Sequence, residues 1–212
     1  MHSVTRQDAT RCNNLLPLVD YLIPMVGNKK AVKILDIGSG PFPKTGQLLD
    51  GVKIELTHCD RKDFADFWHE FGAEPLFPIE YQDMEKLTYP DDSFDIVHCV
   101  NALDHTVNAP TALKEMLRVV KADGWVYIHC VEDQLTTQRK KHYWDAKPDG
   151  TFVNPTERFD LKDYGFSVKY IDIERPARKG EYGQIIGILS PKKQLLVSAL
   201  PLLWSLKVQV VE

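Results

Sequence analysis

The sequence predicts an α/β fold, with a doubly wound, seven-stranded, mainly parallel sheet, an antiparallel last strand and helices on both faces. Apolar runs of strand length alternate with stretches of helical periodicity along most of the chain. Residues 94–100 are almost continuously apolar, which is typical of a central strand that is covered on both faces. The polar stretch 174–182 contains Pro176 and Gly180 and is too short for a helix, so it predicts a hairpin that reverses the last strand.

The order of the elements follows from these patterns. The predicted strands occupy residues 32–37, 52–59, 76–81, 94–100, 125–131, 166–173 and 184–189. Ahead of them, apolar residues recur at helical spacing over residues 8–25, which predicts a helix that forms a lid or wall within an N-terminal segment 1–28. A chain of 212 residues with 43% apolar content can bury one core, so we expect a single domain over residues 1–192.

The tail 193–212 is rich in leucine, is interrupted by Pro201, and has an apolar stretch too short to span a bilayer. We expect this tail to pack on the domain, to pair two copies as a homodimer, or to contact a neighbouring domain.

Composition disfavours several classes of partner. The net charge is −4, from 26 basic and 30 acidic residues, and no long run of like charge occurs, so a nucleic-acid partner is not expected. The four cysteines form no C-x-x-C pair, which indicates reduced thiols in an intracellular, cytoplasmic protein and no metal site. The amino terminus lacks the long apolar core of a secretion signal, so we expect a soluble protein without stable membrane insertion.

A glycine-rich turn follows the first predicted strand. It contains Gly38, Ser39 and Gly40, two residues after Asp36. Glycine permits positive φ and close approach of a ligand to the backbone, and open α/β sheets bind nucleotides at this edge. A dinucleotide would bring a pyrophosphate that the Asp36 carboxylate repels, whereas S-adenosylmethionine carries an ammonium and a sulfonium. We therefore expect S-adenosyl-L-methionine as the cofactor and S-adenosyl-L-homocysteine as the product.

Acidic residues also follow the next two predicted strands. Asp60, with Arg61 beside it, lies where a carboxylate can accept hydrogen bonds from the two ribose hydroxyls. Asp83 lies where it can accept from the adenine amino group, while Met84 covers the ring. Taken singly, each aspartate is also explained as a turn or cap residue. Three acids at successive strand ends together indicate a nucleoside site.

In their order along the chain, these segments resemble class I S-adenosylmethionine-dependent methyltransferases over roughly residues 30 to 190. The resemblance rests on residues 36–40, Asp60, Asp83 with Met84, 93–97 and 117–125. It implies that Asn101 and Ala102 lie beside the methionine part of the cofactor. The chain departs from the family at Pro41-Phe42-Pro43, where many members have another glycine, which puts the contacts to the cofactor's carboxylate end in question.

Candidate catalytic residues follow the fourth predicted strand. His105 is the candidate base, because imidazole titrates near neutral pH, and Asp104 would orient it or bind the acceptor. The alternative is that Asp104 caps a helix that begins near Thr106 and that His105 is a turn residue. Further along, His142, Tyr143 and Trp144 are candidate substrate contacts, although a packed loop explains them equally well.

Glu132 and Asp133, at the end of the fifth predicted strand, could with Asp104 bind a divalent metal through oxygen ligands, but no metal site is expected.

The sequence favours O-methylation of a sugar or glycan hydroxyl, because motifs for methylating bases of nucleic acids are absent. A weaker similarity to methyltransferase domains of glycan-assembly systems points the same way. The alternatives are an O- or N-methyltransferase acting on another small molecule or a lipid, a methyltransferase-like scaffold without catalysis, and a nicotinamide oxidoreductase, which Asp36 and the missing third glycine disfavour.

Overall fold

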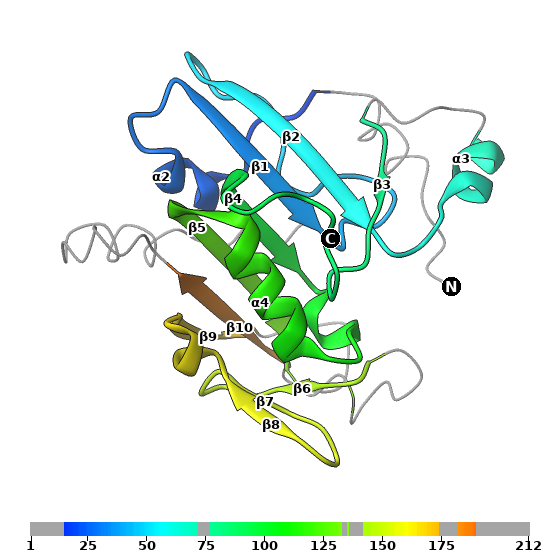
Figure 1. Ribbon diagram of the computed structural model, residues 1–212, viewed down its shortest axis with the longest axis vertical. Coiled ribbons are helices and arrows are strands. Elements are labelled where there is room, and N and C mark those ends of the chain that lie inside the picture. Colours follow the sequence, from blue (N-terminus) through cyan, green and yellow to red (C-terminus); the bar gives the residue numbers. More distant parts are fainter. Residues whose placement is uncertain (1–14, 72–76, 133–134, 136–141, 174–181, 190–212) are drawn as a thin grey trace.

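The chain is described from a computed structural model that defines residues 15–71, 77–132, 135, 142–173 and 182–189. Its main sheet has the strand order β3-β2-β1-β4-β5-β10-β9 (Figure 1). The strands are β1 (Ala31–Ile37), β2 (Lys53–Asp60), β3 (Glu80–Tyr81), β4 (Phe94–Val100), β5 (Val120–Val131), β9 (Ser167–Ile173) and β10 (Tyr182–Leu189). Strands β1 to β5 pair in parallel, and β10 runs antiparallel to both β5 and β9. The predicted fold class and the reversed last strand are confirmed.

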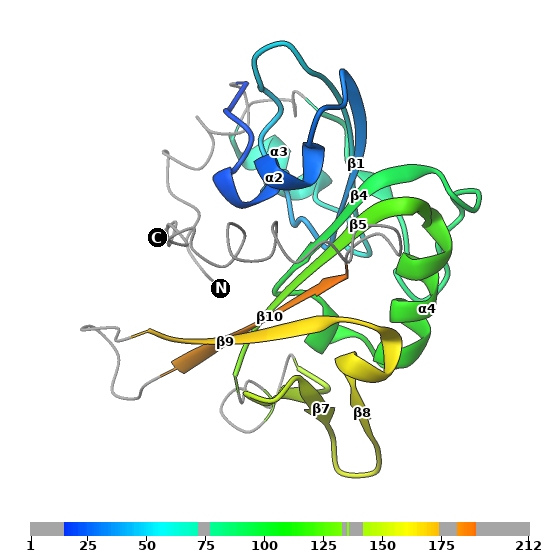
Figure 2. The ribbon, with the colours of Figure 1, turned by 90° about the vertical axis from the view of Figure 1, so that its left-hand side faces the viewer.

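Apolar layers cover both faces of the sheet. On one face, helix α4 (Ala109–Val119) contributes Leu113 and Met116 to a buried cluster that also contains Val97 of β4. Side chains alternate along a strand, so the neighbouring Ile96 points to the other face. There it joins a second cluster with residues of the short turns η1 (Asp20–Leu22) and α2 (Ile23–Val26). Figure 2 shows α2 and α4 on opposite sides of the sheet, as predicted.

The strand order reverses between β1 and β4. From β1 the chain proceeds to β2 and β3 on one side, whereas β4 leads to β5 on the other. The connections after β1 and β4 therefore diverge at the carboxyl ends of these two strands, which is where open α/β sheets bind ligands. The segments that begin at Gly38 and at Asn101 flank this point.

The predicted helix over residues 8–25 is wrong over residues 15–19, whereas helical turns do form near its predicted end. Residues 15–19 are not helical, and the helical turns begin only at Asp20. Pro17 explains the difference, because proline disfavours helix in the residue before it and removes a backbone donor. Pro17 instead bridges to Leu48 of the loop after β1. Residues 8–14 lie outside the described part of the chain.

Helices connect fewer strands than expected. The connection from β1 to β2 is irregular, because Pro41 and Pro43 break helical hydrogen bonding and Gly46 has a φ of +75°. A Cβ atom on Gly46 would lie 1.9 Å from the carbonyl oxygen of Pro17, so the loop is pressed against the N-terminal segment. Within the described residues, α3 (Ala65–Phe71) follows β2, and α4 connects β4 to β5.

A small second sheet was not predicted. It contains β6 (Asp145–Ala146), β7 (Thr151–Val153) and β8 (Arg158–Asp160) and is followed by the turn η3 (Leu161–Tyr164) (Figure 2). Its buried aromatic residues Trp144, Phe152 and Phe159 belong to the same cluster as α4. The sequence predicted only a long connection here.

The tail 193–212 lies outside the described residues, as does the stretch 174–181 between the last two strands. In the part of the chain that is described, no helix combines the length and the apolar character needed to cross a membrane.

Candidate active site

The turn after β1 is tied to the end of β2 and pressed against the segment after β4. The backbone N–H groups of Gly38 and Ser39 both donate to the carbonyl of Cys59, at 2.8 and 3.2 Å. Gly38 and Gly40 have φ values of +66° and +72°, a region that glycine tolerates best. A Cβ atom on Gly38 would lie 2.3 Å from the Cβ of Ala102. Glycine at position 38 is therefore required both by the turn and by the close approach of two segments.

Asp36 lies beneath this turn rather than on its surface. Its side chain has no exposed area, and its two oxygens are bonded to Nδ1 of His98 at 2.8 Å and to the backbone N–H of Lys44 at 2.7 Å. Nε2 of His98 in turn pairs with the hydroxyl of Tyr21 at 2.8 Å. Burial would raise the pKa of Asp36, but His98 and Lys44 outweigh it and hold the pKa below its usual value. The carboxylate is therefore ionised and shapes the loop 38–44.

The ammonium group of Lys44 lies at the carboxyl edge of the sheet, near Asp36. The ammonium of Lys44 donates to the carbonyl of Val100 at 2.9 Å and to that of Gly38 at 3.4 Å. The Val100 carbonyl lies at the end of β4, and the Gly38 carbonyl belongs to the first residue of the turn after β1. The two carbonyls thus form an acceptor pair for an ammonium group. The sequence analysis missed Lys44, because its position depends on the path of an irregular loop.

The two other acids predicted for a nucleoside site lie at the same edge. Asp60 accepts a hydrogen bond from the Gly40 N–H at 3.0 Å and another from the Lys62 N–H at 2.9 Å, and it is partly exposed. Asp83 is also partly exposed and accepts from the Glu85 N–H at 2.9 Å. A carboxylate has about four acceptor sites, so both retain capacity for ligand hydroxyl or amino groups.

The remaining predicted cofactor residues surround the turn. The methyl carbon of Met84 would lie 3.3 Å from a Cβ on Gly38, so Met84 borders the turn. Ala102 is buried against Gly38, and Asn101 is exposed with a φ of +52°. Arg61 is exposed.

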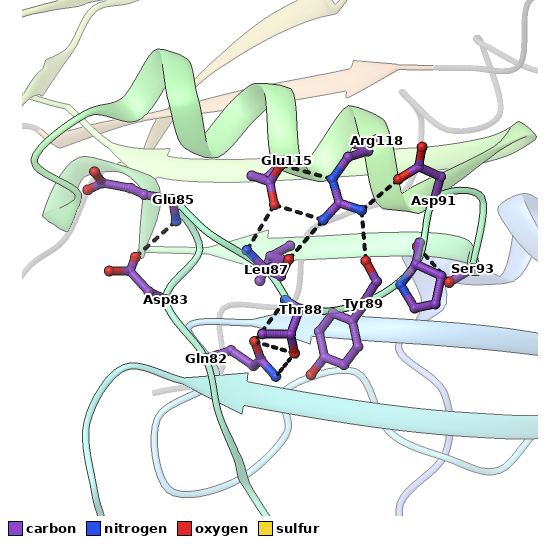
Figure 3. Close-up of polar contacts among 11 residues, drawn as sticks. Gln82, Asp83, Glu85, Leu87, Thr88, Tyr89, Asp91, Ser93, Glu115 and Arg118 are labelled. Atoms are coloured by element: carbon purple, nitrogen blue, oxygen red, sulfur yellow. Dashed lines mark hydrogen bonds and ion pairs between the residues drawn. The ribbon is translucent and has the colours of Figure 1, made fainter.

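Arg118 of α4 is bonded to the segment 87–89, which follows Asp83 in the chain (Figure 3). Its guanidinium donates to the carbonyls of Tyr89 and Leu87 at 2.7 and 2.9 Å. Glu115 pairs with the same guanidinium at 2.8 Å and accepts from the Leu87 N–H at 2.9 Å. These bonds attach residues 87–89 to the helix, so the preceding turn is held at the sheet edge.

On the acceptor side, the structure pairs Asp104 with His142. One carboxylate oxygen lies 2.5 Å from Nδ1 of His142, and the Asp104 side chain is 2% exposed. The His105 and His142 rings are in contact, with centroids 4.1 Å apart. From the sequence, Asp104 was expected to orient His105. Its pairing with His142 could not be predicted, because the turn after β4 and the segment after β5 are brought together only by the long-range path of the chain.

The alternative explanation of Asp104 as a helix cap is wrong. Helix α4 begins at Ala109, and its cap is Asn108, whose side chain accepts from the Thr111 N–H at 3.0 Å. Asp104 instead lies in the short turn η2 (Leu103–His105), directly after β4. Its carbonyl accepts from the Tyr143 N–H at 2.8 Å, which holds the two segments together.

Two of the candidate substrate residues differ in their surroundings. Tyr143 is 48% exposed, whereas Trp144 is fully buried and its ring N–H donates to the Thr106 carbonyl at 3.0 Å. Trp144 also borders a pocket of about 440 Å³ between the start of α4 and the β7–β8 hairpin. The pocket is lined by Asn108, Pro110, Thr111, Lys114, Trp144, Glu157 and Arg158. Most of these side chains are polar or charged.

Comparisons with known proteins agree with this architecture. Residues 35–128 match the model of a family described as a methyltransferase domain. An uncharacterized methyltransferase of Schizosaccharomyces pombe is 29% identical over 172 residues, which cover 71% of this chain and 60% of that protein. A ubiquinone/menaquinone biosynthesis C-methyltransferase of Chromobacterium violaceum is 38% identical over 119 residues, which cover 51% of this chain and 46% of that protein. The aligned part thus spans about half of these relatives' length.

Among solved structures, the cyclase SpnF aligns with a TM-score of 0.51 at 16% identity, covering 89% of this chain and 84% of its own. At this identity the likeness concerns the fold alone. It also illustrates that one fold carries more than one reaction, so function has to be argued from the site.

The turn after β1 gives a matched pair of substitutions. Gly40→Ala meets no atom within 4 Å, so it should cost about 1–2 kcal/mol for the positive φ alone. Gly38→Ala brings the same backbone cost and forces the turn away from Ala102, which should add about 1–3 kcal/mol. Urea unfolding of both variants measures the difference. Equal losses of stability would contradict the close approach of the two segments.

Proposed function

Since residues 35–128 match the model of a methyltransferase domain, we propose that the chain transfers the methyl group of S-adenosylmethionine to a hydroxyl group of a sugar or glycan. The observation that carries the acceptor half of this proposal is the cluster of Asp104 and His105, in the turn after β4, with His142, in the segment after β5. Binding of the methyl donor and activation of the acceptor hydroxyl can be tested separately.

Binding of S-adenosylmethionine is favoured by its positively charged ammonium group. The carbonyls of Gly38 and Val100 accept the Lys44 ammonium, and the ammonium of S-adenosylmethionine offers the same donor and the same charge. In the proposed complex the cofactor's ammonium takes this place and Lys44 withdraws. The ribose hydroxyls donate to Asp60, and the adenine lies against Met84 with its amino group toward Asp83. The pyrophosphate of a dinucleotide would lie beside the partly exposed Asp60 carboxylate and above the buried Asp36 carboxylate, and it is therefore disfavoured.

Methyl transfer to a hydroxyl group requires that the hydroxyl proton leaves. Methyl transfer breaks the bond between sulfur and the methyl carbon, whose electron pair stays on sulfur, and forms a bond from the acceptor oxygen to that carbon. The donor is already activated, so the protein mainly aligns the two groups and assists loss of the hydroxyl proton. The Asp104–His142 pair and His105 supply that assistance at the end of β4.

A polar acceptor fits the pocket between the start of α4 and the β7–β8 hairpin. Five of its seven lining residues, Asn108, Thr111, Lys114, Glu157 and Arg158, carry hydrogen-bonding or charged side chains. Trp144, which also lines the pocket, follows His142 by two residues. Hydroxyl groups of a sugar match such a lining, whereas a largely apolar acceptor would leave these groups without partners.

A second candidate function is methylation of a carbon atom. It is favoured by the 38% identity to the ubiquinone/menaquinone biosynthesis C-methyltransferase, whose aligned region includes 51% of this chain. The same donor site serves both reactions. The position of the new methyl group in the product, read from fragment masses, distinguishes the two.

Cofactor binding is tested by calorimetry with S-adenosylhomocysteine. Asp60→Ala removes the proposed acceptor of two ribose hydrogen bonds, each worth about 1.5–3 kcal/mol when one partner is charged, so affinity should fall by at least about 10-fold. Asp50→Ala, which changes an exposed carboxylate before β2, should bind as the unmodified protein does. If Asp60→Ala binds with unchanged affinity, the proposed ribose contact is wrong.

Acceptor activation is tested by a mass assay with S-adenosylmethionine and a panel of sugars. The unmodified protein should yield a product heavier by one methylene group. Asp104→Asn and His142→Ala should each lower kcat by about 10²–10⁴-fold, the usual contribution of general acid–base assistance. His69→Ala, which alters an exposed imidazole on α3, serves as the control. Full turnover in both cluster variants would eliminate this role.

A further inference from the structure

The side chains of Asp104, His105 and His142 together offer three possible metal-ligand atoms, which we call the donor set. Removal of a single proton would not require all three. One ligand atom from each, a carboxylate oxygen or a ring nitrogen, lies within 4.8 Å of those from the other two. Two imidazoles and one carboxylate are the protein ligands of many catalytic sites for zinc and related divalent ions. We propose that these three residues bind a divalent transition-metal ion of the zinc type, and that the acceptor hydroxyl coordinates to it.

Charge balance supports a bound cation. The Asp104 carboxylate is 2% exposed, and its ion-pair partner among the described residues is an imidazole, which is charged only when protonated. Of the other buried carboxylates, Asp95 pairs with two lysines, whereas Asp36 has an imidazole and a backbone N–H as partners. A buried carboxylate is costly unless its charge is compensated. A divalent ion compensates Asp104 without protonating either histidine.

The cluster is also rigidly held. His105 and Asp104 share the turn η2, in which the His105 N–H donates to the Ala102 carbonyl at 3.1 Å. His142 is positioned from the other segment, where Tyr143 and Trp144 donate backbone hydrogen bonds to the Asp104 carbonyl at 2.8 and 3.3 Å. Ligands fixed by the backbone need only small movements of their side chains to close around an ion.

Among the residues that the structure describes, these three side chains make up the cluster. The thiol of Cys130 donates to a carboxylate oxygen of Asp104 at 4.0 Å. Glu132 accepts a hydrogen bond from the Tyr170 hydroxyl at 2.9 Å. His105 and His142 are partly exposed, so coordination positions remain for water or for an acceptor oxygen.

The ion would act on the hydroxyl proton. A hydroxyl that coordinates to a divalent ion loses its proton more readily, because the ion stabilises the oxygen anion. The proton passes to solvent water, the oxygen attacks the methyl carbon, and the sulfur keeps the electron pair of the broken bond. In this state His105 and His142 are ligands. This role rests on the proposed function, whereas binding of the ion does not.

The test is a titration of the full chain with zinc after treatment with a chelator. Calorimetry should show one ion per chain, and cobalt in its place should give a visible absorption band from ring-nitrogen ligands. Asp104→Asn and His142→Ala should weaken zinc binding by at least about 10- to 100-fold, with thermal unfolding curves that confirm they remain folded. His69→Ala should bind as the unmodified protein does, and magnesium should compete poorly, because it prefers oxygen ligands.

Absence of zinc binding to the unmodified chain, or unchanged binding in both variants, would overturn the inference. S-adenosylhomocysteine is titrated into the same samples. Cofactor binding without zinc binding rejects the metal site and leaves the proposed function standing. Zinc binding that the cluster variants abolish, without any cofactor binding, supports the metal site and rejects the proposed function.

Discussion

The buried contact between Asp36 and His98 is the constraint on which the site depends. The two residues face each other across the central strands β1 and β4, in register and without solvent exposure. A carboxylate in such a place is tolerated because each oxygen has a hydrogen-bond partner. One partner is the His98 ring, and the other is the backbone N–H of Lys44. The same interaction therefore joins the two strands at the reversal point and sets the path of the loop 38–44.

The positions of the surrounding groups follow from the path of the loop 38–44. With the loop drawn down over Asp36, the backbone of Gly38 meets Ala102 and the Gly40 N–H reaches Asp60. The Lys44 side chain returns to the carbonyls at the edge of the sheet. The carboxylates that the sequence placed at successive strand ends thus have different tasks. Asp36 builds the turn, whereas Asp60 and Asp83 remain partly exposed at its rim.

Much of the fold could be predicted because its signals are local. The strand 94–100 was predicted with its observed bounds, since continuous burial on both faces leaves a continuous apolar run. The strands of the small sheet, of two or three residues each, are too short to show a period. Spacing alone suggested a helix around Pro17, but residues 15–19 are not helical. Candidate residues at strand ends were predictable from topology. The pairing of Asp104 with His142 was not, because it depends on a long-range chain path.

We propose that the carboxyl edge of β1, β2 and β4 holds S-adenosylmethionine. A crystal structure of the chain with S-adenosylhomocysteine would test this placement. We expect ribose hydroxyls on Asp60, adenine against Met84, and the ligand's ammonium on the carbonyls of Gly38 and Val100, with the Lys44 side chain displaced from them. A ligand bound elsewhere on the domain, or Lys44 retained on these carbonyls with the ligand in place, would contradict it.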